Sequence, residues 1–184
     1  MTPQTYNAYY NPSNNEIVLP AAIFTIPGVP DSAIDDAVAY GYVAAGTIGH
    51  EITHGFDDEG RQFDAYEPMP GLHINGKAGL GENIADYGGV LLGLDAFKKT
   101  AQYKEGKKIG GLTPLQRYFL GYAIGWMSQQ RDEALRSQLL SDVHSPAKWR
   151  VLGPISNVPE FYQAFGVRPG DPMYRADSVR VQIW

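Results

Sequence analysis

Apolar residues recur along most of the chain at the three- and four-residue spacing that is typical of amphipathic helices. The predicted helices run over residues 37–52, 82–103 and 113–140, and two short ones begin near residues 145 and 158. Either Asp31 or Ser32 can cap the first of them, and Thr113 with Pro114 begins the third. Gly88 and Gly89 in the second helix would let another helix approach closely.

A different pattern covers residues 5–19, where polar and apolar positions alternate on both sides of the turn-forming stretch "NPSNN". This segment is expected to form a hairpin or a pair of edge strands. The fold class is therefore α+β, mainly α, with a small N-terminal β-sheet and a helical body. With 184 residues, 43% of them hydrophobic, the chain is expected to form a single domain over residues 1–184.

The net charge of -5 is spread over interspersed carboxylates, so we expect neither a nucleic acid nor an anionic membrane as a partner, but peptides or small molecules. Cysteine is absent, so a metal site has to be built from His, Asp and Glu. The sequence contains no targeting segment and no apolar run long enough to span a bilayer, so the chain as given is expected to be soluble, in an undetermined compartment. Excision from a longer exported precursor would place it in the periplasm or outside the cell.

Residues 46–60, "GTIGHEITHGFDDEG", contain a glutamate between two histidines at the spacing H-E-x-x-H. On a helix His50 and His54 lie about 40° apart around the axis and roughly 6 Å apart along it, so both imidazoles can reach one cation. A metal there would lower the pKa of a bound water, and Glu51 would take its proton. The pattern predicts peptide-bond hydrolysis.

A third metal ligand is expected in "GENIAD", because the position six residues beyond His54 is Gly60 and not a further histidine. Glu82 and Asp86 share one helical face, which alone is more often solvated. Apolar neighbours and two glycines favour an inward-facing pair. We expect Glu82 to bind the metal and Asp86 to orient a ligand imidazole.

The chain resembles the zinc lobe of the neprilysin-type metallopeptidases through several motifs in the same order. These are "NAYYNPSNNEIVLPAAI", "GTIGHEITHGFDDEG", "GENIADYGG", "DVHSPAKWRVLGPISN" and the terminal "VQIW". The resemblance implies a thermolysin-like fold with one zinc ion per chain. Its ligands would be His50, His54 and Glu82, and Glu51 would be the general base. The resemblance further implies that Asp86 holds His50, while Asp57 supports a ligand from the face of His54.

Two further catalytic residues follow from the resemblance. His144 matches the histidine that stabilises the oxyanion of the transition state, and Asp142 would orient it. Arg150 matches an arginine that grips the backbone or the terminal carboxylate of a substrate. Without the resemblance, His144 would be a surface residue capping a helix and Arg150 part of a surface salt bridge.

The remaining residues implied by the resemblance bind substrate. Asn7 and Ala8 match an edge strand that pairs with an extended peptide. Trp126 and Ile23 match walls of the pocket for the residue after the scissile bond, although each could equally belong to the core. The fourth histidine, His73, has no matching catalytic role.

The sequence departs from the family in two places. Family members have a large helical lobe before the "NAYY" motif, and a further stretch where this chain passes from Asp64 directly to Ala65. The second difference is either a true deletion or an excision. The leading expectation is a zinc endopeptidase that cleaves on the amino side of hydrophobic residues. The alternative is a zinc-retaining peptide-binding or regulatory fragment with little turnover. An exposed lobe-facing surface would favour a homodimer.

Overall fold

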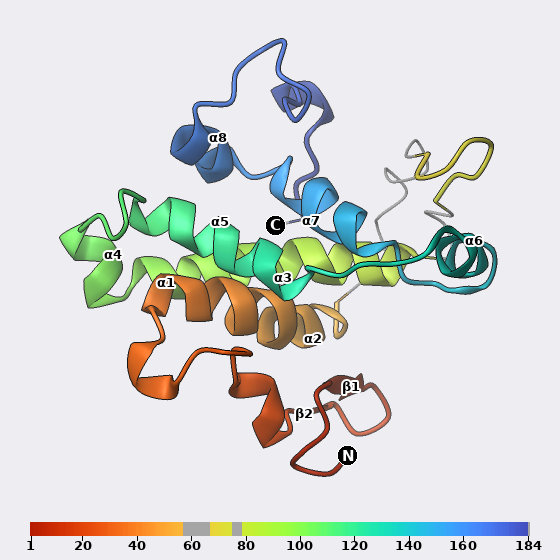
Figure 1. Cartoon of the computed structure of the whole chain (residues 1–184), viewed down its shortest axis with the longest axis horizontal. Helices are drawn as coiled ribbons and strands as arrows, with labels where there is room; N and C mark the ends of the chain where they lie inside the picture. Colours follow the sequence, from red (N-terminus) through yellow and green to blue (C-terminus); the bar gives the residue numbers. More distant parts are fainter. Residues whose placement is uncertain (57–66, 75–78, 184) are drawn as a thin grey trace.

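The computed structural model describes residues 1–56, 67–74 and 79–183. Asp57 and the junction between Asp64 and Ala65 lie outside these ranges, so the structure does not place them. Helices dominate and a single small sheet lies near the N-terminus of the described chain (Figure 1), which confirms the α+β, mainly α fold class.

The sheet is the predicted hairpin. Strands β1 (Tyr9–Asn11) and β2 (Glu16–Val18) pair antiparallel, with Tyr9 opposite Val18. Asn15 in the connecting turn has a φ of 48°, a left-handed conformation that asparagine tolerates better than most residues. After the hairpin, the 3-10 turns η1 (Ala21–Phe24) and η2 (Asp31–Ala33) lead to the helical body.

The first long helix is continuous through α1 (Asp36–Ala39), the π-helical segment η3 (Tyr40–Gly49) and α2 (His50–Thr53). The prediction that Asp31 or Ser32 caps it was wrong, because both belong to η2. Asp35 is the cap: its side chain accepts a hydrogen bond of 3.2 Å from the backbone N–H of Val38. Its carboxylate also meets Arg117, a partner remote in the sequence.

The second and third predicted helices are each divided in two. α3 (Leu80–Lys98) ends before α4 (Ala101–Glu105), because the Thr100 hydroxyl caps a new helix. α5 (Pro114–Gly125) begins at Thr113, as predicted, with a capping box formed with Gln116. It ends at Gly125, with Trp126 as the C-cap, and α6 (Asp132–Ser141) follows a short loop. The two short helices are confirmed as α7 (Ala147–Ile155) and α8 (Pro159–Phe165), and the 3-10 turn η5 (Asp177–Val179) follows them.

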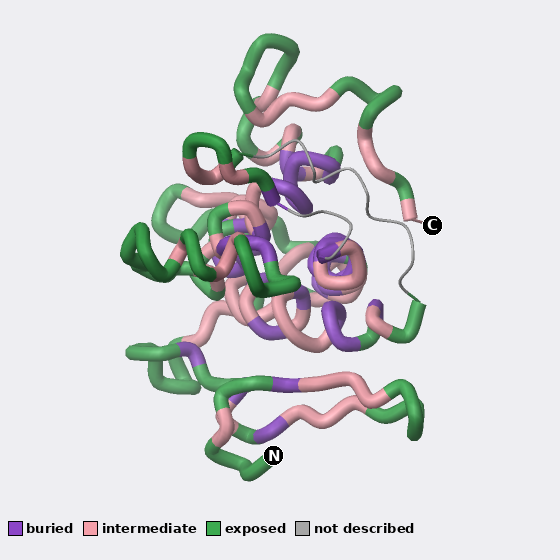
Figure 2. Tube along the Cα trace, turned by 90° about the vertical axis from the view of Figure 1, so that its right-hand side faces the viewer, coloured by how far each residue is buried: buried purple, intermediate pink, exposed green. Residues whose placement is uncertain are grey.

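α3 packs along the first helix and against α7, and α5 packs against the first helix and α8 (Figure 1). The buried residues concentrate on these central helices, whereas the hairpin strands are mostly of intermediate burial and the outer loops are mostly exposed (Figure 2). The core is largely aromatic: Phe97 stacks on Tyr118, with 5.7 Å between ring centroids, and Phe119 meets Phe161 edge-on at 5.5 Å. This core fixes the crossing of the helices that bear the candidate ligands.

Glycines bring the first helix and α3 into backbone contact, as predicted from Gly88 and Gly89. A Cβ atom added to Gly49 would lie 2.8 Å from the Cα of Gly89, and one added to Gly89 would lie 2.3 Å from the carbonyl oxygen of Ala45. A Cβ on Gly88 would lie 2.4 Å from the Thr53 hydroxyl. No larger residue fits at this crossing, which brings the end of the first helix beside the start of α3.

Within the described residues, no helix combines the length and apolar character needed to cross a bilayer.

Candidate metal centre

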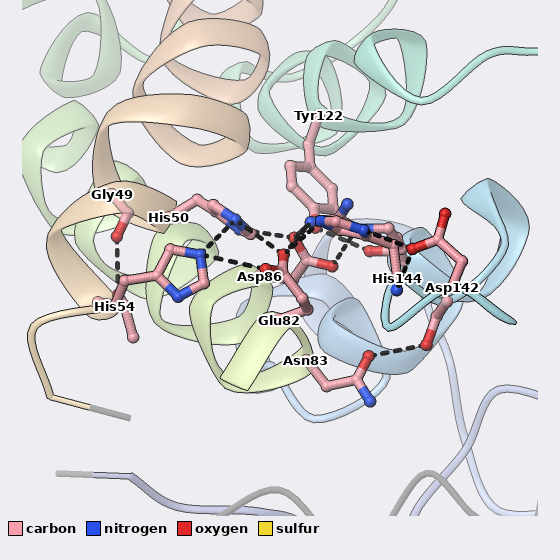
Figure 3. A network of polar contacts seen from close by, with 12 residues as sticks. Gly49, His50, His54, Glu82, Asn83, Asp86, Tyr122, Asp142 and His144 are labelled. Carbon is pink, nitrogen blue, oxygen red and sulfur yellow. Dashed lines mark hydrogen bonds and ion pairs between the residues drawn. The ribbon is translucent and has the colours of Figure 1, made fainter. Parts of the chain in front are cut away.

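Three potential ligands converge where the first helix crosses α3. The Nε2 atoms of His50 and His54 lie 3.0 Å apart, and those atoms are 3.3 and 3.5 Å from the two carboxylate oxygens of Glu82. One ligand atom from each residue lies within 4.8 Å of the others. Figure 3 shows the three side chains pointing toward one another from two helices. Two imidazoles and one carboxylate are a ligand set that suits zinc in catalytic sites.

Asp86 holds the far side of the His50 ring. Its Oδ1 lies 2.9 Å from the Nδ1 of His50, so Nε2 faces the other two ligands. Burial lowers the pKa of His50, but the hydrogen bonds to Asp86 and Glu82 outweigh it and raise this pKa to about 9. The fixed ring orientation fits a metal placed between the three ligands.

Arg150 joins the same network from α7. Its Nε donates to Oδ2 of Asp86 at 2.7 Å, and its Nη2 donates to Oδ1 at 2.8 Å and to Glu82 at 3.3 Å. Burial raises the pKa of Asp86, but Arg150 and His50 outweigh it, so the carboxylate stays charged. The guanidinium also lies 4.0 Å from the centroid of the Trp126 ring. The structure therefore places Arg150 beside the ligands.

His144 lies in the loop between α6 and α7, and its Nε2 is 3.3 Å from an oxygen of Glu82. Oδ1 of Asp142 accepts hydrogen bonds from the backbone N–H of His144 at 2.9 Å and from its Nδ1 at 2.7 Å. Both side chains are partly exposed. An oriented, solvent-accessible imidazole beside the ligands can donate a hydrogen bond to a reacting group.

The ligands form one wall of a cleft of about 650 Å³. Residues proposed from the sequence share this cleft, namely Asn7, Ala8, Ile23, Glu51, Trp126, His144 and Arg150. Asn7 is exposed, Ala8, Ile23 and Glu51 are buried, and Trp126 is half-buried. The exposed His73 does not line the cleft. The structure thus gathers residues from four separate parts of the chain around one set of ligands.

Sequence reasoning did not find three features of this site. They are the direct bond between Arg150 and Asp86, a hydrogen bond between the hydroxyls of Tyr6 and Tyr42 in the cleft, and a hydrogen bond between Asn83 and Ser145. The only local signal was at Asn83, a polar residue in an inward-facing apolar stretch, which has to find a partner when buried. The partner itself is 62 residues away.

Comparison with known proteins shows which family this chain resembles. The model of Peptidase family M13 matches residues 7–69 and 61–181, two segments that meet around the junction between Asp64 and Ala65. Neprilysin-3 of Drosophila melanogaster is 35% identical over 217 aligned positions, which include all of this chain and 27% of the relative. Endothelin-converting enzyme 1 of Homo sapiens is 36% identical over 94% of this chain and 26% of its own length.

Solved structures agree with this assignment. The zinc metalloprotease ZMP1 of Mycobacterium tuberculosis, in complex with an inhibitor, superposes with a TM-score of 0.89 at 39% identity, over all of this chain and 33% of that protein. PEPO from Lactobacillus rhamnosis gives a TM-score of 0.82 at 32% identity, over 97% of this chain and 31% of its own. The chain spans about a quarter to a third of the length of these proteins.

Proposed function

The chain belongs to Peptidase family M13, and we propose that it is the metal-binding part of a zinc-dependent endopeptidase that cleaves peptides on the amino side of hydrophobic residues. One observation carries the proposal: the ligand atoms of His50, His54 and Glu82 converge at a cleft that Glu51 and His144 also line. We propose one zinc ion per chain at these three ligands.

Zinc, when bound, supplies a Lewis acid that makes water a stronger acid at this site. Glu51 is buried in the wall of the cleft, where it would accept the proton of the attacking water and return it to the leaving amine. His144, held by Asp142, would donate a hydrogen bond to the oxyanion of the transition state. Asp86 would keep the His50 ring in place through its bond to Nδ1.

The substrate would lie along the hairpin side of the cleft. We propose that Asn7 and Ala8 pair with the backbone of an extended peptide, as an additional strand beside β1. Ile23 and Trp126 would form the walls for the hydrophobic residue after the scissile bond. Within the described chain Arg150 donates hydrogen bonds through Nε and Nη2, so we assign substrate contact to its Nη1.

Two measurements test the proposal. Elemental analysis of purified protein should find one zinc per chain, and a metal-free preparation that does not bind added zinc would end the proposal. Glu51→Gln should keep the zinc and abolish cleavage of a fluorogenic peptide, because the amide is nearly isosteric but a poor base. Glu133→Gln, at an exposed glutamate of α6, is the matched control and should cleave like the wild type. Equal rates for Glu51→Gln and the wild type would show that Glu51 is not the base.

A further inference from the structure

A buried hydrogen bond connects the loop of His144 to the helix of Glu82. The hydroxyl of Ser145 donates to Oδ1 of Asn83 at 2.9 Å, and the two residues are 4% and 2% exposed. Asn83 follows Glu82 in α3, and Ser145 follows His144 in the loop before α7. The bond thus joins the direct neighbours of a candidate metal ligand and of the candidate oxyanion donor. Figure 3 shows Asn83 beside Glu82 on this side of the site.

Among the described residues, the His144 imidazole itself also reaches α3, 3.3 Å from Glu82, and the remaining side-chain hydrogen bonds of this loop end elsewhere. Asp142 holds His144 from within the loop, and the exposed Gln138 of α6 donates to the carbonyl oxygen of His144 at 3.1 Å. The first contact stays within the loop and the second joins it to α6, so neither ends on α3. The bond from Ser145 to Asn83, by contrast, ends on the helix that presents Glu82, so it sets where His144 stands relative to the ligands.

Burial of an asparagine at this position lowers the stability of the fold if the side chain only fills space. The Nδ2 atom of Asn83 is buried and has no hydrogen-bond partner in the described structure. An apolar side chain of similar size would leave no polar group unpaired. The hydrogen bond from Ser145 is therefore the feature that explains why an asparagine is buried at this position.

We propose that the hydrogen bond between Asn83 and Ser145 positions His144 for the reaction. This inference rests on the proposed function, since it acts through the role of His144. Asn83 and Ser145 touch neither ligand nor substrate. They hold the loop at the distance from Glu82 at which the imidazole can reach the oxyanion. Misplacement of a reacting group by about 1 Å can slow a reaction by about a hundredfold.

The first test compares Ser145→Ala with Ser156→Ala. Ser156 is an equally buried serine, 4% exposed, whose hydroxyl makes a bond of the same length to Gly153 at the other end of α7. We expect Ser145→Ala to lower kcat by about tenfold, with KM within about twofold and an unchanged zinc content. Ser156→Ala should leave all three values close to wild type. Ser145→Thr retains a hydroxyl and should restore most of kcat. Equal effects of both alanine variants, or a loss of zinc in Ser145→Ala, would overturn the inference.

A second test asks whether the effect passes through His144. In a His144→Ala background the additional change Ser145→Ala should alter kcat by less than about twofold, because no imidazole remains to be positioned. A further tenfold loss in that background would show that Ser145 acts by another route. Asn83→Ala should give the same pattern, and the double variant Asn83→Ala with Ser145→Ala should be no slower than either single variant.

NMR of the metal-free protein tests the inference without any activity. The chain has four histidines, so the imidazole signals are few and can be assigned by substitution. His144 should give one sharp set of signals in the wild type and Ser156→Ala, and broadened or multiple signals in Ser145→Ala. Unchanged His144 signals in Ser145→Ala would contradict the positioning role, even in a protein that hydrolyses peptides. A wild type without zinc or hydrolysis would instead refute the proposed function, and the spectra would still show whether the bond orders the loop.

Discussion

Two aspartate–arginine pairs with buried arginines lie near the two ends of the first long helix, on the order of 20 Å apart. In one, Arg117 donates through Nε to both oxygens of Asp35 at 3.1 Å. In the other, Arg150 donates to both oxygens of Asp86 at 2.7 and 2.8 Å. The arginines are similarly buried, 5% and 8% exposed, but the side chain of Asp35 is 18% exposed and that of Asp86 only 1%.

The two pairs differ in the other hydrogen-bond partners of their aspartates and arginines. Asp35 also caps the first helix, and Arg117 also donates to the backbone carbonyl of Leu112, so this pair fixes main chain to main chain. Asp86 also holds the imidazole of His50, and Arg150 also reaches Glu82 and lines the cleft, so the second pair fixes the candidate metal ligands. The same kind of ion pair thus holds main chain in one place and the candidate metal ligands in the other.

The largest difference between the two pairs is expected when each arginine is replaced by lysine, which keeps the charge but loses the planar guanidinium group. Arg150→Lys should lower kcat/KM by about a hundredfold, because Asp86 and Glu82 lose fixed donors. Arg117→Lys should leave kcat/KM within about twofold. Both should lower the free energy of unfolding by about 1–3 kcal/mol. Peptide cleavage and urea unfolding measure the two effects, and equal losses of kcat/KM would remove the distinction.

The two aspartates can be compared through zinc affinity. Asp86→Asn should weaken zinc binding by about 10- to 100-fold, because the partner of the ligand imidazole loses its charge. Asp35→Asn should leave the affinity unchanged, and asparagine should preserve the helix cap. Competition with a chromophoric chelator gives both constants. A similar loss in both variants would mean that the fold as a whole sets the affinity.

Alkaline pH should weaken the helix packing that links the two regions. Burial raises the pKa of Tyr118 and of Tyr122 well above the usual 10. Each phenol stays neutral in the folded chain while its unfolded counterpart ionises, so the stability is fully present below pH 10 and falls as the pH rises beyond it. The slope is about 1.4 kcal/mol per pH unit for each tyrosine. Urea unfolding between pH 9 and 11 measures it, and a flat profile would contradict the burial of both phenols.

The smallest expected effect separates these two tyrosines. The hydroxyl of Tyr118 donates to the carbonyl oxygen of Val90 at 2.6 Å, and that of Tyr122 donates to the carbonyl oxygen of Arg150 at 2.8 Å. Each Tyr→Phe variant should lose about 1 kcal/mol of stability. Only Tyr122→Phe should also lower kcat, by a few-fold, because it frees the backbone of Arg150. If Tyr118→Phe lowers kcat equally, the two regions are not separable.

The features predicted correctly from the sequence depend on local spacing. His50 and His54 stand four residues apart, and so do Glu82 and Asp86, so helix geometry alone places each pair on one face. The hairpin and the cap at Thr113 also follow from neighbouring residues. Such signals need no knowledge of the remaining chain.

The errors and omissions depend on partners remote in sequence. Asp35 rather than Asp31 caps the first helix because it also meets Arg117, 82 residues away. Arg150 was predicted from the resemblance to grip a substrate, and its bond to Asp86 crosses 64 residues without a periodic signal. The helix breaks at Lys99 and Trp126 were missed for a different reason, because two local signals were passed over: the cap at Thr100 and the polar run over residues 128–133.

The π-helical winding of η3 has a consequence for the shape of the cleft. Tyr42, Gly46, His50 and His54 all line it, at a constant step of four residues. In an α-helix four residues overshoot a full turn by about 40°, so such a row would spiral away from the substrate. The i→i+5 bonds of a π-helix put more than four residues into each turn, so the same step falls short. The overshoot of the α-helical step and the shortfall of the π-helical step oppose each other where η3 passes into α2. The row of cleft residues therefore stays nearly parallel to the helix axis. Removal of one residue from η3 would rotate the preceding residues of the helix, including Tyr42, relative to His50 and His54. The row along the cleft would then be lost, although the H-E-x-x-H spacing would remain intact.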